Sequence, residues 1–149
     1  MITIISLSVF GAIIAAVVGT VWYSDKTPMG KLHMKYLGFD KLNEEEKKKN
    51  IEEAKPKMFK LYVGQMLLSF LTAFAVVFVI VMSVGNGTTF GVAMLFVLMN
   101  WLCFIVPTIG TGILWSNCDR SIAWKKFSSD ISYNLVTLIL TALLTGLFV

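Results

Sequence analysis

Apolar residues fill long uninterrupted stretches of this chain instead of recurring at the spacing of a single buried helix face. The stretches 1–24, 61–118 and 131–149 contain no charged side chain. A membrane-spanning helix needs about 20 apolar residues, so the middle stretch is long enough for two such helices. Its Gly-Asn-Gly sequence at 85–87 is a strong turn signal that divides it. The pattern therefore predicts four membrane-spanning helices, at about residues 2–23, 59–82, 90–115 and 131–148.

Composition supports this class, because 56% of the residues are hydrophobic and only 15% are charged. A soluble four-helix bundle would have polar outer faces, which these segments lack. A chain of 149 residues has room for one bundle and for no separate soluble domain. We therefore expect an all-α integral membrane protein with a single domain over residues 1–149.

The positive charges lie in two of the three connections, and this asymmetry indicates a topology. All 13 Lys and Arg residues fall within 24–60 or 116–130, and none lies around Gly85. If the helices alternate in direction, both charged connections emerge on the same side of the membrane. The positive-inside rule then places the loops 24–58 and 116–130 in the cytoplasm and both termini outside. Four aromatic residues at these boundaries are expected to anchor in the headgroup region: Trp22, Tyr23, Trp115 and Trp124.

The net charge of +4 does not by itself indicate nucleic-acid binding. Segment 24–60 holds ten Lys residues but also seven acidic residues, so basic and acidic side chains are interleaved. Contact with anionic lipid headgroups is the simpler explanation of the excess. We expect membrane lipid as a partner and no nucleic acid.

The first charged connection carries helix signals of its own. Asn43 and Glu46 have the spacing of a capping box, and Glu44 precedes Lys48 by about one helical turn. We expect a short surface helix over about 44–54 that runs almost directly into the second spanning helix, with Pro56 in a first turn. A solvated helix that shortens the loop is preferred here to a docking site for a cytoplasmic partner.

The two charged boundaries resemble each other. The same order of residue types occurs at both: Trp22, Asp25, Lys26, Thr27 and Lys31 in the first, and Trp115, Asp119, Arg120, Ser121 and Lys125 in the second. The match predicts two helical hairpins related as a parallel repeat, with a pseudo-axis along the membrane normal. The alternative is that any helix leaving the membrane on the cytoplasmic side tends to end in tryptophan and charges.

Inside a bilayer, helices associate through small residues and hydrogen bonds. Gly11, Ala15 and Gly19 form a small-residue ridge on the first helix, which lets a neighbouring backbone approach closely. Polar stripes on the second and fourth helices are expected to face the interior of the bundle: Gln65, Ser69 and Thr72 on the second, and Asn134, Thr137, Thr141 and Thr145 on the fourth.

The third spanning helix combines polar residues with a proline. Asn100, Pro107 and Thr111 lie on one side of it, and Thr108 stands beside the proline. Proline removes a backbone donor and displaces a carbonyl, so we expect a kink near the middle of the membrane. Such a helix could line a cavity for a small polar solute. The alternative is that the amide side chains of the bundle hydrogen-bond to one another and only fix its packing.

Several chemistries are disfavoured. No Asp, Glu, Lys, Arg or His lies at the depth of the hydrocarbon core, although proton relays and ion-coupled carriers use at least one. The only histidine, His33, has no Cys or His neighbour at metal-binding spacing, and no nucleotide or hydrolase motif occurs. Asp25, Asp119 and Asp130 could form a polar cluster with His33 at the cytoplasmic boundary, where ion pairing is the preferred role. We expect no enzyme activity, no cofactor and no metal.

A family resemblance rests on several of these features. The first helix ends in Gly19-Thr20-Val21-Trp22-Tyr23-Ser24, Gly30-Lys31 follows, a charged helix precedes the second span, and the third span ends near Trp115. With these features the chain resembles, over nearly its whole length, the small prokaryotic membrane family catalogued as domain of unknown function 1761. The resemblance implies a four-span protein of a prokaryotic plasma membrane without an established activity. It assigns no catalytic or binding residue.

Two function classes fit this sequence. The first is a small-solute permease or channel-like subunit, alone or as a homo-oligomer, with a water-filled path bordered by Gln65, Asn100, Thr108 and Asn134 and with Ser69, Pro107 and Thr111 nearby. The second is a non-catalytic structural or accessory protein that binds lipid or a partner membrane protein through the Gly11–Gly19 ridge and the cytoplasmic loops. This second class predicts a dry bundle with an exposed small-residue groove.

Overall fold

The computed structural model describes residues 2–87 and 89–149, and it contains no β-strand within those ranges. The helices are α1 (Ile2–Trp22), α2 (Pro28–Tyr36), α3 (Glu44–Gly85), α4 (Phe90–Asn100), α5 (Val106–Leu114) and α6 (Arg120–Gly146). A π turn, Trp101–Ile105, joins α4 to α5, and a 3-10 turn, Phe39–Lys41, follows α2. Four helical segments in these ranges are long and apolar enough to cross a membrane: Ile2–Trp22, Glu44–Gly85, Phe90–Leu114 and Arg120–Gly146. The predicted all-α membrane bundle with four spanning helices is confirmed.

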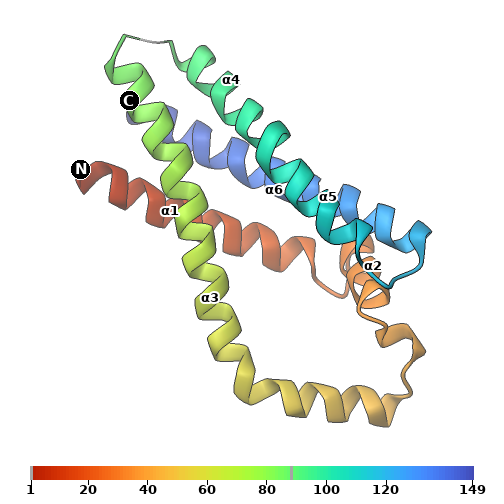
Figure 1. Cartoon of the computed structure of the whole chain (residues 1–149). Coiled ribbons are helices and arrows are strands. Elements are labelled where there is room, and N and C mark those ends of the chain that lie inside the picture. Colours follow the sequence, from red (N-terminus) through yellow and green to blue (C-terminus); the bar gives the residue numbers. More distant parts are fainter. Residues whose placement is uncertain (1, 88) are drawn as a thin grey trace.

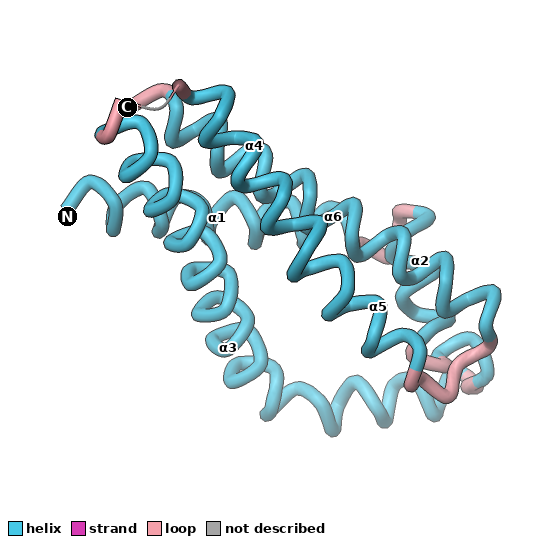
Figure 2. Tube along the Cα trace, turned by 45° about the horizontal axis from the view of Figure 1, so that its top comes forward, coloured by secondary structure: helices cyan, strands magenta, loops and turns pink. Residues whose placement is uncertain are grey.

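The two ends of the bundle differ in what they carry. In Figure 1 both chain termini lie at the left with the turn between α3 and α4, while α2 and the connection from α5 to α6 lie at the right. Figure 2 shows the same separation from a second direction. We call these the terminal end and the charged end, since all Lys and Arg residues lie in 24–60 and 116–130, which in Figure 1 occupy the right side and, with the start of α3, the bottom. An even number of crossings explains why the two chain ends lie together.

The second spanning helix and the predicted surface helix form one continuous helix, α3. Its start is as expected: Asn43 accepts a hydrogen bond from the Glu46 amide at 2.8 Å, and Glu46 accepts one from the Asn43 amide at 2.9 Å. The break expected at Pro56 does not occur, because this proline lies inside the helix. The residues around it are exposed, so water can satisfy the carbonyl that proline leaves unpaired. The α3 ribbon bends between its charged start and its apolar remainder (Figure 1).

The fourth spanning helix is longer than predicted. α6 begins at Arg120, where the Asp119 side chain caps it by accepting hydrogen bonds from the Ser121 amide at 2.9 Å and the Ile122 amide at 3.2 Å. The segment 116–130, expected as a loop, is therefore mostly helical. The start of α6 was not predicted, because this segment contains charged and serine residues and the charge-free stretch used to place the span begins only at Ile131.

The third spanning helix is disturbed directly before its proline. The amide of Val106 donates to the carbonyl of Trp101, five residues back, and this widened turn is the π turn 101–105. Pro107 then lies in the first turn of α5, a position where the helix tolerates a residue without an amide hydrogen. The sequence predicted a kink at this place, and the structure accommodates the proline by the extra residue in the turn.

The small-residue ridge of α1 packs inside the bundle. A β-carbon added to Gly11 would lie 2.7 Å from Ala73 Cβ and 2.8 Å from Thr141 Cγ2, so α3 and α6 both approach α1 here. At Gly19 an added β-carbon would lie 3.1 Å from the hydroxyl of Tyr133. The ridge is thus occupied by the chain's own helices, and it does not form the exposed groove expected for an accessory protein.

A hydrophobic core fills the bundle toward the terminal end. It combines residues of α3, α4 and α6: Val76, Ile80, Ala93, Val97, Leu138 and Ala142. Ile80 lies near the end of α3 and Ala93 near the start of α4, so this core lies next to the turn that joins them. The polar stripe of α6 continues beside it, with Thr137, Thr141 and Thr145 buried as predicted.

The proposed repeat of the two hairpins stays a prediction. The two tryptophans that define it have different surroundings, because Trp22 is half-buried and hydrogen-bonded to α6, whereas Trp115 is 85% exposed. The helices that follow them also differ in length, at 9 residues for α2 and 27 for α6. Trp124 is half-exposed, so Trp115 and Trp124 have faces that are available to a surrounding bilayer.

Candidate functional site

A polar cavity of about 200 Å³ lies between α1, α3 and α6, and we call it the inner cavity. Its polar wall consists of Gln65, Ser69, Thr72, Tyr133, Asn134, Thr137 and Thr141. Gly11, Ala15, Leu68, Ala73 and Leu138 supply the apolar remainder of the lining. Gly11 is near the middle of α1, and Tyr133 is less than one turn from Asp130. The cavity therefore extends from the centre of the bundle toward the charged end.

The polar groups of this wall are only partly used by the chain. The Asn134 amide donates one hydrogen bond to the carbonyl of Asp130 at 2.9 Å, and the Gln65 amide donates one to Ser69 Oγ at 3.4 Å. Thr137 and Thr141 donate to carbonyls of their own helix at 2.9 and 2.8 Å, which leaves their oxygens able to accept. Among the described residues, no hydrogen bond from the chain engages the side-chain oxygen of Gln65 or Asn134. These oxygens are available to a bound molecule.

The candidate pathway residues are divided between two places. Gln65, Ser69 and Asn134 line the inner cavity together, as expected. Asn100 lines a different pocket of about 240 Å³ between α3, α4 and α6, where apolar residues such as Trp101 and Phe104 predominate. The inner cavity and this pocket share Thr72 and Leu138 as a common wall.

The polar stripe of the third spanning helix lies outside the inner cavity, so the expectation that it lines the same cavity is wrong. Asn100, Pro107, Thr108 and Thr111 are all exposed. Asn100 donates to the Phe96 carbonyl at 2.9 Å, Thr108 to the Phe104 carbonyl at 2.6 Å, and Thr111 to the Pro107 carbonyl at 2.9 Å. These hydrogen bonds are made within one helix and not across the bundle. The inward face of this segment is apolar instead and includes Ala93, Val97 and Ile113.

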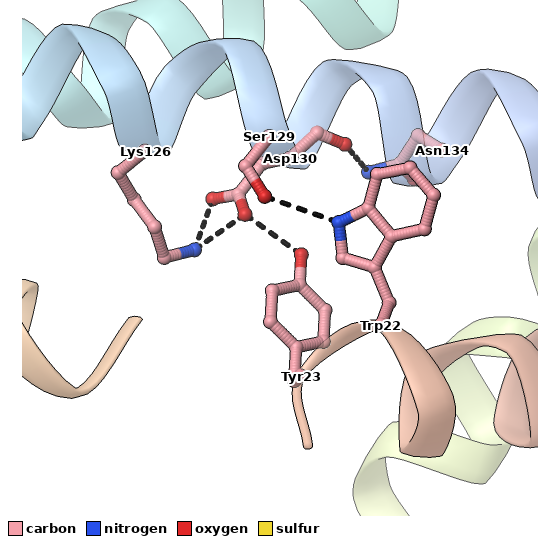
Figure 3. A network of polar contacts seen from close by, with 6 residues as sticks. All are labelled: Trp22, Tyr23, Lys126, Ser129, Asp130 and Asn134. Atoms are coloured by element: carbon pink, nitrogen blue, oxygen red, sulfur yellow. Dashed lines mark hydrogen bonds and ion pairs between the residues drawn. The ribbon is translucent and has the colours of Figure 1, made fainter. Parts of the chain in front are cut away.

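A second polar site joins the end of α1 to α6 at the charged end (Figure 3). The Tyr23 hydroxyl donates to Asp130 Oδ1 at 2.7 Å, and the Trp22 indole donates to Ser129 Oγ at 3.1 Å. Lys126 forms an ion pair with both oxygens of Asp130, one helical turn away. These contacts fix the end of α1 on the α6 surface, so Trp22 and Tyr23 are packing residues as much as interface anchors.

Aromatic rings surround the lysine of this network. Lys126 is only 6% exposed, and its ammonium lies 5.2 Å from the centre of the Tyr23 ring and 5.6 Å from that of Tyr36. Both distances are within the range of cation–π attraction. The charge is therefore balanced by Asp130 and by two ring faces, which is what a buried lysine requires.

His33 of α2 packs against the same network. Its ring centre lies 5.2 Å from that of Tyr23, and its buried Nδ1 atom has no hydrogen-bond partner in the described part of the chain. Burial lowers the pKa of His33, the Lys126 charge lowers it further, and Asp130 acts in the opposite direction. The imidazole is thus favoured in its neutral form.

The expected boundary cluster of three acids and His33 is only half assembled. Asp130 and His33 do lie close to the same network, but Asp119 serves as the α6 cap and Asp25 is exposed. Lys126 and Tyr133 were not identified as members of the cluster. Their spacing was the available signal, because Lys126, Asp130 and Tyr133 lie at intervals of four and three residues and share one helix face. Neither their pairing with α1 nor their burial could be read from that spacing.

A third pocket, of about 610 Å³, lies between the end of α1, the helix α2 and the first turns of α6, and we call it the basic pocket. Its polar lining consists of Lys31, Lys35, Lys125, Ser128, Ser129 and Ser132. Trp22, Met29 and Leu32 supply apolar surface. The Trp22 to Ser129 hydrogen bond forms part of its wall, so the polar network of Figure 3 also shapes this pocket.

Comparison with known proteins identifies the family and nothing more specific. A family model described as a protein of unknown function, DUF1761, matches residues 6–146. No curated protein matches the chain. No solved structure matches it. The match extends over nearly all of the chain, from the second turn of α1 to the last residue of α6, and it includes the residues of the inner cavity, the polar network and the basic pocket. The chain therefore belongs to the DUF1761 family, as its Gly-x-x-Trp-Tyr-Ser segment and its four spans had indicated.

Proposed function

We propose that this protein is a non-catalytic, permease-like membrane subunit that binds a small uncharged polar solute in the inner cavity. The observation that carries the proposal is the lining of the cavity by amide and hydroxyl groups, without a charged side chain among its lining residues. A charged solute at this depth would need a compensating charge, whereas a neutral one needs only hydrogen bonds. At about 30 Å³ per water molecule, the cavity has room for about seven waters. The solute therefore has few non-hydrogen atoms.

The position of the cavity is consistent with access from one side. Gln65 and Thr72 are exposed, so the α3 wall is not sealed, and the polar lining continues to Tyr133 near the charged end. Toward the terminal end, the hydrophobic core of α3, α4 and α6 closes the bundle. With the charged end in the cytoplasm, as the positive-inside rule predicts, the solute would reach the cavity from the cytoplasmic side.

The flux of small solutes tests the proposal. Purified protein is reconstituted in liposomes, and the entry of glycerol and of urea is followed by stopped-flow light scattering. We expect Gln65→Leu to reduce the protein-dependent flux about fivefold, which corresponds to one hydrogen bond of about 1 kcal/mol. Asn100→Leu is the matched control, since it also removes an exposed amide from a spanning helix but lies outside the inner cavity. Equal flux through both variants, or no flux of either solute above that of protein-free liposomes, contradicts the proposal.

The access of water to the cavity gives an independent test. In a Cys103→Ser/Cys118→Ser background, we expect Ser69→Cys to react with a small water-soluble thiol reagent. Val77→Cys is the control, because Val77 is 0% exposed in the core. A Ser69→Cys variant that reacts no faster than Val77→Cys shows a dry cavity and rules out a permease.

The second candidate is an accessory role in a complex within the membrane. It is favoured by the outward stripe of Asn100, Thr108 and Thr111, since polar side chains that face lipid favour association with another helix. Cys103 is exposed on the same segment. If a second copy of the chain is the partner, oxidative cross-linking of Cys103 in membranes yields a dimer, and Asn100→Leu weakens it. The absence of such a dimer rules out self-association through this face.

A further inference from the structure

We propose that the basic pocket binds the phosphate headgroup of an anionic phospholipid from the surrounding bilayer. This inference does not rest on the inner cavity, because the two sites share no lining residue. The basic pocket holds about 610 Å³, which is large enough for a glycerophosphate headgroup and the start of an acyl chain. Its chemistry, its shape and its place at the end of α1 all contribute to the assignment.

The charge of the pocket is unbalanced. Lys31 and Lys35 lie one turn apart on α2, and Lys125 faces them from α6, while no acidic residue contributes to the lining. In the described part of the chain the ion pairs are Lys47 with Glu44 and Lys126 with Asp130, so these three lysines have no ionic partner there. Three like charges around one pocket repel one another. A bound anion removes that repulsion, and each lysine near a membrane surface contributes about 1 kcal/mol of attraction to anionic lipid.

Hydroxyl groups of α6 add donors suited to phosphate oxygens. Ser128, Ser129 and Ser132 lie along the pocket, within about one turn of each other, and Ser128 already donates its hydroxyl hydrogen to the Trp124 carbonyl at 3.2 Å. Ser129 accepts a hydrogen bond from Trp22, and the hydrogen of its own hydroxyl is still available for donation. Ser132 is exposed on the pocket side. Lysines for charge and hydroxyls for directed hydrogen bonds form a donor set that matches a phosphodiester.

The apolar part of the lining distinguishes a lipid from a soluble anion. Trp22, Met29 and Leu32 border the pocket next to the lysines, so one ligand would contact both kinds of surface. Met29, Met34 and Leu37 also leave apolar surface exposed on and just after α2, at 38%, 36% and 52%. A short helix with this composition at the end of a spanning helix lies in the headgroup region. The pocket is therefore at the depth where a phospholipid presents its phosphate and the first part of its chains.

The experiment compares two lipids on two charge-matched variants. Thermal unfolding of the full chain in neutral detergent is titrated with dioctanoyl phosphatidylglycerol or dioctanoyl phosphatidylcholine. The pocket variant is Lys31→Gln/Lys35→Gln/Lys125→Gln. The control is Lys48→Gln/Lys49→Gln/Lys57→Gln, which removes the same charge from exposed positions of α3. We expect wild type and control to bind phosphatidylglycerol more tightly than phosphatidylcholine. We expect the pocket variant to bind phosphatidylglycerol about a hundredfold more weakly, at roughly fivefold per lysine.

Other outcomes overturn the proposal. Equal weakening in both variants shows a diffuse charge effect, and equal binding of the two lipids shows no headgroup selectivity. Stabilisation by glycerol 1-phosphate as strong as that by phosphatidylglycerol assigns the pocket to a soluble anion. Stabilisation by polyglutamate, but not by lipid, assigns it to an acidic protein segment. If the triple variant does not fold, Lys31→Gln alone is measured, and an unchanged phosphatidylglycerol affinity is then the contradicting result.

Discussion

Asp130→Asn tests the electrostatic account of the polar network at the charged end. The substitution removes the charge that balances Lys126 but preserves the shape of the side chain, and its carbonyl can still accept the Tyr23 hydrogen bond. Any loss of stability therefore reports on the unpaired lysine. Lys126 cannot relax easily into water, because its side chain is only 8% exposed.

The expected magnitude follows from opposing contributions. Breaking a buried ion pair by removing one partner typically destabilises a protein by about 3–5 kcal/mol. The rings of Tyr23 and Tyr36 retain part of the attraction for the ammonium, about 0.5–2 kcal/mol. We expect Asp130→Asn to lower the free energy of unfolding by about 2–3 kcal/mol. The double variant Lys126→Met/Asp130→Asn has no charge left to balance, and we expect a loss of only about 1 kcal/mol.

The assay is equilibrium unfolding in mixed detergent micelles with increasing dodecyl sulfate, followed by far-ultraviolet circular dichroism. Lys57→Met is the control for the loss of a lysine, because Lys57 is exposed and forms no ion pair within the described residues. We expect it to change the free energy of unfolding by no more than about 0.5 kcal/mol. The reasoning is refuted if Asp130→Asn is as stable as wild type. It is also refuted if the double variant is no more stable than Asp130→Asn.

Two further predictions concern packing and pH. Gly11→Ala should destabilise the bundle by about 1–3 kcal/mol, since its β-carbon would lie 2.7 Å from Ala73 Cβ. Gly112→Ala is the control, because the space around Gly112 is open, and it should be neutral or slightly stabilising in the same dodecyl sulfate titration. Equal effects of the two substitutions would contradict this packing. Because the pKa of His33 is lowered from 6.5, the neutral form stabilises the fold above pH 6.5, and this contribution is lost as pH falls through the lower folded value. The stability of wild type should therefore fall between about pH 7 and pH 5 more than that of His33→Gln, and equal pH dependence would refute the assignment.

The candidate site could be predicted in part. The polar stripes at three- and four-residue spacing identified Gln65, Ser69 and Asn134, which do meet in the inner cavity. The same reasoning grouped Asn100 and Thr108 with them, although both are exposed and lie outside this cavity. Helical periodicity shows which residues share a face, but it does not show toward what the face is turned. In a membrane this ambiguity is greater than in water, because hydroxyls and amides can satisfy themselves on their own helix, as Thr108 does on the Phe104 carbonyl.

The sequence by itself determined the number of spanning helices and which of their connections lie at the same end of the bundle. Charge-free length is a local property, and the cost of burying Lys and Arg in lipid confines them to the connections, so both can be read without knowing any contact. Only the tertiary structure decided which residues from distant segments meet. Tyr23 and Asp130 are 107 residues apart, and the basic pocket combines α2 with the first turns of α6, which the sequence had presented as a loop. These sites depend on the rotation and crossing of each helix, and the packing of the whole bundle sets both.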